Sequence, residues 1–385
     1  MATYKEQNKL NVPHLRFPKF YGEWCVSTIG EQFDLYSGNT PSRLNKEHFD
    51  GNVNWITSGE LKEHYISDTK EKISEDAATA NNLKLLHPGT FVIAIYGLEA
   101  DGVRGTGSIT CKESTISQAC MAFTQKGDVK NEFLYSWYKK HGNIIGIKYA
   151  QGTKQQNLSY DILEKFHIAY PSQDEQDKLI QFISLLDKRI ATQSKLIEKL
   201  ESLIKGIAQH CIRELINGWE YVRLGDICKI TTGKLDANAQ VENGQYLFFT
   251  CAERPFNIDS YAFDTEALLI SGNGANLGYI NYYKGKFNAY QRTYVLDHFS
   301  VNIQYVKWAL KVLLPQRIAI EKSSSNTPYI VLSTLADLKI PIPNNSKQNH
   351  IADLMMSFER KLSTQLALSD LYNKQKQYLL RQMFI

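Results

Sequence analysis

The longest regular pattern of apolar positions runs from about residue 174 to residue 216, with gaps that alternate between three and four residues. Such a heptad pattern predicts a long helix that packs against a partner helix along one narrow apolar face. The stretch contains no proline, and its single glycine, Gly206, costs a helix only about 1 kcal/mol relative to alanine. Pro171 precedes the helix, and Asn217-Gly218 is a helix-stop signal. The predicted seam comprises Leu179, Phe182, Leu186, Ile190, Gln193, Ile197, Leu200 and Ile204, followed by Ile207 and Cys211.

The same pattern returns from about residue 347 to residue 384 and supplies the partner. Pro343 and Gln348 correspond to Pro171 and Gln176, and a glutamine takes the same seam position in both stretches, as register-setting polar residues do. Two unrelated amphipathic core helices are the alternative, but the flanking residues repeat as well, which favours two copies of one element. This seam comprises Ile351, Leu354, Phe358, Leu362 and Gln365, with Leu379 and Met383 further on.

The sequence outside these stretches also repeats, which divides the chain into four parts. Matching positions include Trp24 and Trp219, Gly30 and Gly225, Gly38 and Gly233, Ser117-Gln118 and Tyr290-Gln291, residues 131–137 and 302–308, and Leu158-Ser159 and Leu332-Ser333. We therefore predict a first domain over residues 1–172, a long helix over 173–217, a second domain over 218–344 and a second long helix over 345–385.

Within each domain, short β-type runs alternate with a few helices, which predicts an α+β fold with a twisted sheet and long polar loops. The fold class is thus two α+β domains alternating with two long helices that form an antiparallel coiled coil, an internal pseudo-twofold repeat. The expected strands are 91–96, 120–124, 166–170, 246–250, 268–271, 279–283 and 294–296. The expected helices are 131–141 and 301–320, the latter bent or broken near Pro315.

Composition narrows the class of protein without deciding it. The formal net charge of +4 permits nucleic acid as a partner but does not require it. The six cysteines form no CxxC pair and the nine histidines no HExxH motif, which predicts reduced thiols and no zinc site. The start of the sequence has no signal-like apolar region, and no apolar run approaches 18 residues. These features predict a cytoplasmic protein without a membrane span.

Polar loops recur in the same order in both halves, and they hold the candidate binding residues. Backbone amides, hydroxyl groups and cationic side chains bind phosphates, while Asn, Gln and Arg side chains can read base edges. A single polar loop is as readily an ordinary connection, but the repetition in both halves favours DNA binding. The expected contacts are Ser42, Arg43, Lys46, Arg104, Lys154, Gln155 and Asn157 in the first half, and Lys234, Arg254, Asn273, Asn276, Arg292 and Asn326 in the second.

Two enzyme classes are alternatives to a DNA-binding role. The glycine-rich stretch 272–278 resembles a cofactor loop, but a strand-like aromatic run follows it where a phosphate-binding loop must open into a helix. The chain also contains no Pro-Pro, which the amine-binding motif of amino-methyltransferases requires. Glu63, Asp68, Glu71 and Lys72 could belong to a nuclease metal site, but a solvated charged loop explains them equally well. We therefore predict no catalytic residues and no metal site in this chain.

The whole chain resembles the DNA-specificity subunit of type I restriction-modification systems. The resemblance rests on motifs that occur in order along the chain. They are Pro13-x-Leu15-Arg16-Phe17-Pro18 with Trp24, Gly38-Asn39-Thr40-Pro41-Ser42, residues 152–159, Tyr170-Pro171-x3-Glu175-Gln176 and the closing residues 379–384. The second domain departs from the pattern after Gly233 and at residues 323–328, so its contact residues are less securely assigned.

The resemblance implies a non-catalytic role. Each target-recognition domain would read one half of a bipartite DNA target, and the helices would fix the spacing of the half-sites and dock the partners. Those partners would be two methyltransferase subunits using S-adenosylmethionine, and restriction subunits using ATP and Mg²⁺. No cofactor would be bound by this chain itself. The alternative is a self-contained DNA methyltransferase or nuclease.

Overall fold

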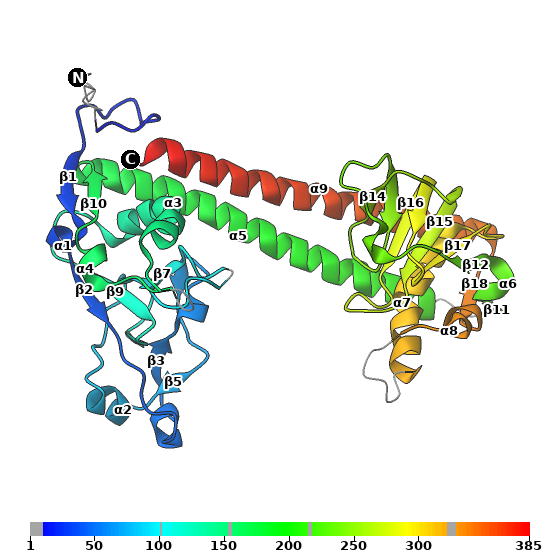
Figure 1. Cartoon of the computed structure of the whole chain (residues 1–385), viewed down its shortest axis with the longest axis horizontal. Coiled ribbons are helices and arrows are strands. Elements are labelled where there is room, and N and C mark those ends of the chain that lie inside the picture. The colour runs from blue at the N-terminus through cyan, green and yellow to red at the C-terminus, as the bar shows by residue number, and fades with distance from the viewer. Residues whose placement is uncertain (1–10, 101, 153–155, 215–217, 322–328) are drawn as a thin grey trace. The chain divides into compact units, whose positions relative to one another are not determined.

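The computed structural model describes residues 11–100, 102–152, 156–214, 218–321 and 329–385. The chain divides into two compact units, Met1–Ser194 with Leu368–Ile385, and Lys195–Ala367. Each unit holds one α+β domain together with one end of each of two long helices, α5 (Gln173–Gln209) and α9 (Asn345–Met383), as Figure 1 shows. The boundary between the two units falls within both long helices. It therefore does not test the division into four parts, which stays a prediction from sequence.

The first domain is built on a five-stranded sheet in the order β2-β9-β6-β7-β4, as far as the chain is described. A second sheet has the order β5-β3-β8, and β1 pairs with β10. The strands are β1 (Cys25–Thr28), β2 (Phe33–Ser37), β3 (Val53–Ile56), β4 (Tyr65–Ile66), β5 (Lys72–Ile73), β6 (Phe91–Ala94), β7 (Gly107–Thr110), β8 (Ser114–Ile116), β9 (Cys120–Gln125) and β10 (His167–Tyr170). The helices are α1 (Ile29–Gln32), α2 (Glu75–Ala80), α3 (Asn131–Tyr149) and α4 (Tyr160–Leu163), with short 3-10 turns η1 (Lys46–Phe49) and η2 (Ser58–Glu60).

The central strand of this sheet is apolar and buried on both faces. All four residues of β6 are buried, as expected for a strand covered on both sides. Helix α3 supplies part of the cover through Phe133, Leu134 and Trp137, which belong to the same core cluster. Trp24, a repeated residue of the sequence, packs its ring against Phe133 at 5.8 Å between centroids.

The second domain has a six-stranded sheet in the order β12-β17-β15-β16-β13-β14, and β11 pairs with β18. The strands are β11 (Glu220–Arg223), β12 (Lys229–Thr232), β13 (Tyr246–Phe249), β14 (Phe256–Ile258), β15 (Phe263–Ser271), β16 (Ile280–Ala289), β17 (Thr293–Asp297) and β18 (Lys339–Ile342). The helices are α6 (Leu224–Ile227), α7 (Ile303–Glu321) and α8 (Leu332–Ala336), with a π-helical turn η3 (His210–Glu214) after α5 and a 3-10 turn η4 (Ala237–Ala239).

Strand pairing confirms the predicted internal repeat. In the first domain, β3 pairs antiparallel with β5 and parallel with β8. In the second, β13 pairs antiparallel with β14 and parallel with the end of β16. Strand β16 thus corresponds to β7 and β8 together, which residues 111–113 separate in the first domain. The matched strands follow one order in the two domains, and the first domain adds β4, which pairs parallel with β7.

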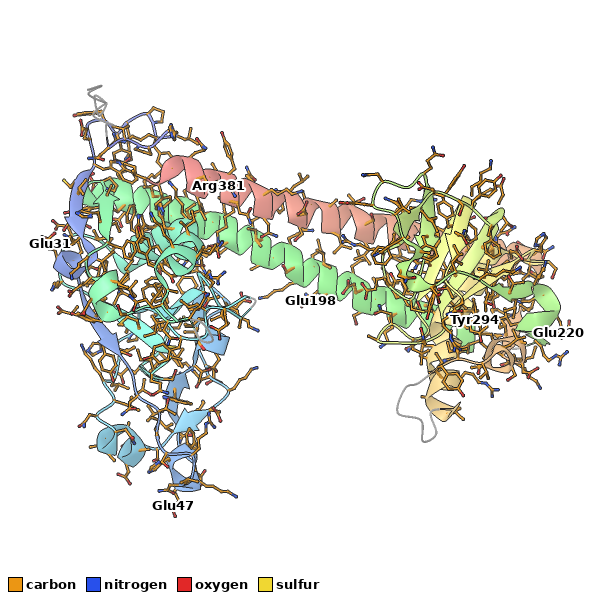
Figure 2. All side chains as sticks on the ribbon, viewed as in Figure 1. Glu31, Glu47, Glu198, Glu220, Tyr294 and Arg381 are labelled. Carbon is orange, nitrogen blue, oxygen red and sulfur yellow. The ribbon has the colours of Figure 1, made fainter. Side chains whose placement is uncertain are left out.

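The two long helices run antiparallel to each other. In the first unit, Asp187 of α5 pairs with Lys376 of α9, and Arg189, further along α5, stacks on Tyr372, which is earlier on α9. The predicted seam residues are all buried or half-buried, whereas polar residues such as Glu198 and Arg381, labelled in Figure 2, are exposed. Ile183 and Met355 are also fully buried, although the heptad pattern did not place them on the seam.

A buried glutamine joins each long helix to its domain. The Gln176 side chain accepts a hydrogen bond from the Lys130 backbone N–H at 3.0 Å and donates to the Pro171 carbonyl at 3.1 Å. Lys130 is the residue before α3, where helix N–H groups lack partners inside the helix. The carboxylate of Glu175, the residue before Gln176, is held by Arg16 at 2.7 and 2.8 Å. The Tyr170–Gln176 motif therefore anchors the start of α5.

The second-domain helix, which we expected to be bent or broken near Pro315, is not broken there. Helix α7 continues through Pro315, which cannot donate a hydrogen bond and crowds the preceding turn. Pro315 leaves the carbonyl of Lys311, four residues earlier, without its usual donor in the helix. The Arg213 guanidinium donates to the neighbouring carbonyl of Val312 at 3.2 Å. Helix α3 also extends beyond the expected end at His141, to Tyr149. Across the described residues, no helix is both long and apolar enough to cross a membrane.

Candidate nucleic-acid interface

Several loops of the second domain meet at one edge of its sheet. Gly272, after β15, donates its N–H to the Arg292 carbonyl at 2.8 Å, and the Gly272 carbonyl accepts from the Ile330 N–H at 2.8 Å. The Asn276 side chain donates to the Cys251 carbonyl, after β13, at 3.0 Å. Tyr294, labelled in Figure 2, donates its hydroxyl to the Ile330 carbonyl at 2.9 Å. These bonds make one continuous polar edge from loops far apart in the sequence.

Six residues of the second half are expected to contact DNA, and the structure describes five of them. All five lie in the loops of this edge. Lys234, Arg254 and Arg292 are exposed, and Asn273 and Asn276 are half-buried. Asn276 uses its side-chain amide to join two loops, so its observed role is structural. Three exposed cations beside backbone amides can meet phosphates or base edges.

The beginning of this edge lies at Gly233, and the first domain has a counterpart at Gly38. A Cβ atom on Gly233 would lie 1.8 Å from the Ala289 carbonyl oxygen, and one on Gly38 would lie 1.8 Å from the Ile116 carbonyl oxygen. Ala289 and Ile116 precede the matching pairs Tyr290-Gln291 and Ser117-Gln118. Each glycine therefore lets the loop after the first sheet strand pass directly over the parallel-paired strand, β16 or β8.

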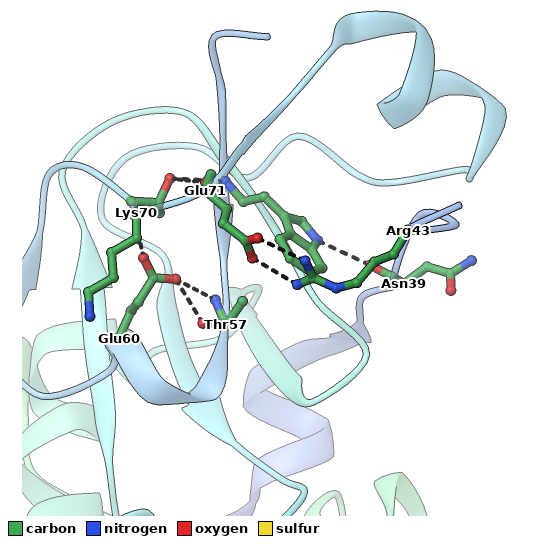
Figure 3. A network of polar contacts seen from close by, with 8 residues as sticks. Asn39, Arg43, Thr57, Glu60, Lys70 and Glu71 are labelled. Carbon is green, nitrogen blue, oxygen red and sulfur yellow. Dashed lines mark hydrogen bonds and ion pairs between the residues drawn. The ribbon is translucent and has the colours of Figure 1, made fainter. Parts of the chain in front are cut away.

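In the first domain, the loop after Gly38 carries Ser42, Arg43 and Lys46, all exposed. Arg43 makes a two-pronged ion pair with Glu71, with both N···O distances 2.8 Å, as Figure 3 shows. Its guanidinium also lies over the ring of Phe49, at 5.0 Å, and that of Trp55, at 5.7 Å. The pairing holds the pKa of the Glu71 carboxyl below its usual range, so the carboxylate stays ionised.

The neighbouring turn is fixed by Glu60. Its carboxylate accepts hydrogen bonds from the backbone and hydroxyl of Thr57, each at 2.9 Å, and from the Lys70 N–H at 2.7 Å (Figure 3). The second domain has the same Thr-x-x-Glu spacing at Thr250 and Glu253. The turn after β3 is therefore tied to the chain at Lys70, the residue before Glu71.

A second group of expected DNA-contact residues lies where the loop between β6 and β7 meets the stretch before α4. Arg104 donates to the Gln156 side chain at 2.9 Å, and its aliphatic part lies against Gly146 of α3. Asn157 pairs its backbone with Gln151. Both residues are half-buried, so each contributes to the fold of this loop pair. Lys154, Gln155 and Asn326 lie outside the described residues.

The sequence does not reveal the role of Glu71. Its pattern groups Glu71 with Glu63, Asp68 and Lys72 as a possible metal site. Asp68 of that group instead pairs with Lys72, and Glu71 with Arg43. Among the described residues, no three or more His, Cys, Asp or Glu side chains are placed to hold a metal ion. The glycine-rich stretch 272–278 leads into β16, as expected, so it does not open into a helix. The Arg43–Glu71 pair spans 28 positions, a separation that no local pattern reveals.

Comparison with known families gives a match over most of the chain. The family described as type I restriction modification DNA specificity domain matches residues 21–202 and 216–368. The two matched segments contain the two domains and most of both long helices.

Individual relatives agree with this match. The chain is 24% identical to the type I restriction enzyme MjaIX specificity subunit of Methanocaldococcus jannaschii, over 83% of each protein. It is 43% identical to the EcoDI specificity subunit of Escherichia coli over 149 residues, which span 39% of this chain but 31% of that protein. The crystal structure of a type I S subunit from M. genitalium has a TM-score of 0.64 at 19% identity, covers 97% of this chain and 99% of its own, and shows the same fold.

Proposed function

This chain belongs to the type I restriction modification DNA specificity family, and we propose that it is the specificity subunit of a type I restriction-modification complex. Each domain reads one half of a bipartite DNA target through its polar sheet edge. The observation that supports this proposal is the repeated edge, with Gly38 and Gly233 passing over equivalent strands. A split target requires two reading surfaces, one for each half-site, and the two domains each supply one.

The side chains along the two edges suit DNA. Exposed arginine and lysine side chains neutralise phosphates, and arginine also reads guanine in the major groove. A net charge of +4 is modest for a DNA-binding chain of this length. Partner subunits that also contact the duplex would supply the remaining electrostatic attraction.

The long helices form the second part of the proposal. The antiparallel pair fixes the spacing between the half-sites, in the way that dimer geometry sets half-site spacing elsewhere. Both helices carry exposed apolar residues, among them Leu185 and Leu203 of α5 and Leu371 of α9, which can dock partner subunits. Two methyltransferase subunits and restriction subunits are the partners that fit this role.

The chain itself is proposed to be non-catalytic. S-adenosylmethionine, ATP and Mg²⁺ would be bound by the partner subunits, and this chain would bind no cofactor. A methyltransferase acting on a duplex base must turn that base out of the stack, so firm placement on the target sequence is what the specificity subunit contributes.

The test is a single-molecule methylome of cells with and without the gene, with the partner genes intact. Loss of adenine methylation from one split motif, restored by a plasmid copy, is the expected result. A methylome that does not change while the complex is expressed would contradict the proposal. Incubating the purified chain alone with S-adenosylmethionine or Mg²⁺ and DNA tests the enzyme alternative, and we expect no turnover.

A further inference from the structure

Arg43 is held in one orientation by the residues around it. The Glu71 carboxylate accepts hydrogen bonds from Nη1 and Nη2 of Arg43, each at 2.8 Å. These bonds use one hydrogen on each of the two terminal nitrogens of the guanidinium. An arginine has five N–H donors, so Nε–H and the second hydrogen of Nη2 remain available along one side of the group. The side chain of Arg43 is 60% exposed, so this free side can reach a ligand.

The support beneath the pair is rigid. Trp55 is 2% exposed and donates its indole N–H to the Asn39 carbonyl at 3.2 Å, which ties it to the loop that carries Arg43. Thr69 accepts from the Trp55 N–H at 3.3 Å and donates its hydroxyl to the Glu71 carbonyl at 2.7 Å. Both partners of the ion pair are therefore fixed through Trp55.

We propose that Arg43 reads a guanine edge in the half-site of the first domain, with Glu71 as its positioning residue. This inference rests on the proposed function and adds to it which kind of DNA group Arg43 contacts. The free side of the guanidinium presents two parallel donors, and guanine offers two matching acceptors, O6 and N7, in the major groove.

The charge of the pair separates a base contact from a phosphate contact. Glu71 cancels the charge of Arg43, so the pair is neutral and gains little from a phosphate, whose attraction depends on net positive charge. A base edge needs directed donors rather than charge. By contrast, Arg254 and Arg292 of the second domain form no ion pair within the described residues, so they keep the full charge that a phosphate contact uses.

The experiment is selection of bound duplexes from a random DNA library by the full-length chain, in complex with its partners, followed by affinity measurements at several salt concentrations. The variants are Arg43→Lys, which keeps the charge but loses the fork, and Glu71→Gln, whose amide accepts only one of the two bonds. The matched controls are Arg223→Lys and Asp226→Asn, a similar two-pronged surface pair with distances of 3.0 and 3.1 Å, away from both edges.

We expect both test variants to lose preference for G·C at one position of one half-site by about tenfold or more. The other half-site stays selected, which shows that the chain is folded. Arg43→Lys, which keeps the charge, leaves the dependence of affinity on salt as in the wild type. The controls keep the full motif. Arg43→Lys with an unchanged motif, or a change of about one unit in the salt slope without loss of base preference, would overturn the inference. Glu71→Gln with the G·C preference intact would overturn the positioning role. Wild-type chain that selects no split motif would contradict the proposed function itself, and the inference with it.

Discussion

Gln176 and Gln348 occupy equivalent positions near the starts of α5 and α9, and their carboxamides make the same hydrogen bonds within their own units. Gln348 accepts from the Asn302 N–H at 3.0 Å and donates to the Pro343 carbonyl at 2.8 Å, as Gln176 does with Lys130 and Pro171. Both side chains are essentially inaccessible. Each long helix is thus attached to its domain at the residue that precedes the main domain helix.

Replacing either glutamine with leucine leaves a buried N–H and a buried carbonyl without partners. We expect Gln176→Leu and Gln348→Leu each to lower the free energy of unfolding by about 1–3 kcal/mol. Urea denaturation measures the loss. The exposed Gln181 on α5 provides the control, because its replacement by leucine removes no buried hydrogen bond. Equal stability of the Gln176 and Gln181 variants would contradict the anchoring role.

His64 predicts a pH dependence of the first unit. Nδ1 lies 3.0 Å from Asp187 of α5 and Nε2 lies 2.9 Å from Glu132 of α3, while the ring stacks on Tyr135 at 3.9 Å. Burial disfavours the charged ring, but the hydrogen bonds to the two carboxylates outweigh it and raise the pKa of His64 above 6.5. Lys376 and Lys139 are the nearby cations, and Tyr65 packs on the other face of the ring.

A raised pKa in the folded state means that the ion pairs contribute fully below pH 6.5, and that their contribution is lost as the pH rises through the folded-state pKa. We expect the melting temperature of the wild type to fall over this range, and His64→Gln to lower stability at pH 6 and to flatten the curve. Thermal unfolding between pH 6 and 9 measures both. A His64→Gln curve parallel to that of the wild type would contradict the assignment.

Gly38→Ala and Gly233→Ala place a methyl group 1.8 Å from a backbone carbonyl oxygen, so the loop or the strand must move. We expect each to lower stability by about 1–3 kcal/mol, as overpacking does, and to weaken selection of one half-site only. Gly206→Ala is the control, because nothing lies within 4 Å of its Cβ position on α5. It should stabilise the chain by about 0.5–1 kcal/mol. Thermal unfolding and duplex selection test these outcomes.

Arg292→Ala removes an exposed charge, which forms no ion pair within the described residues, from the edge of the second domain. We expect weaker DNA binding for all sequences and a salt slope smaller by about 0.9, which is the signature of one lost phosphate contact. Titrations of labelled duplex at several salt concentrations measure it, with Arg223→Ala as the matched surface control. Unchanged affinity and slope would remove Arg292 from the interface.

The elements with long periodic patterns were predictable from sequence. The heptad pattern placed the first helix start at residue 174 and the structure begins α5 at Gln173, because apolar spacing and the Pro171 turn are local signals. After Gln209 the helix continues as a π-helical turn to Glu214, and the predicted end at residue 216 lies outside the described residues. The strand order within each domain was not predictable, because pairing depends on contacts between distant segments.

The candidate site, too, was only partly predictable from the sequence. Glycines and polar residues at repeated positions indicated the loops, since they recur in both halves. The role of each side chain within a loop was not visible. Arg104 packs along α3 at Gly146, and Asn276 joins two loops, because partners far away in sequence decide which polar groups stay free.

If each domain reads one half of the target independently, exchange of one domain changes one half-site alone. The second domain would be replaced by that of a family member with a different known target, both long helices being kept, and the methylome of the cells determined. We expect a new split motif that keeps one half-site and the original gap and changes only the other half-site. A motif in which both half-sites change, or methylation of the unaltered original motif, would contradict independent reading by the two domains.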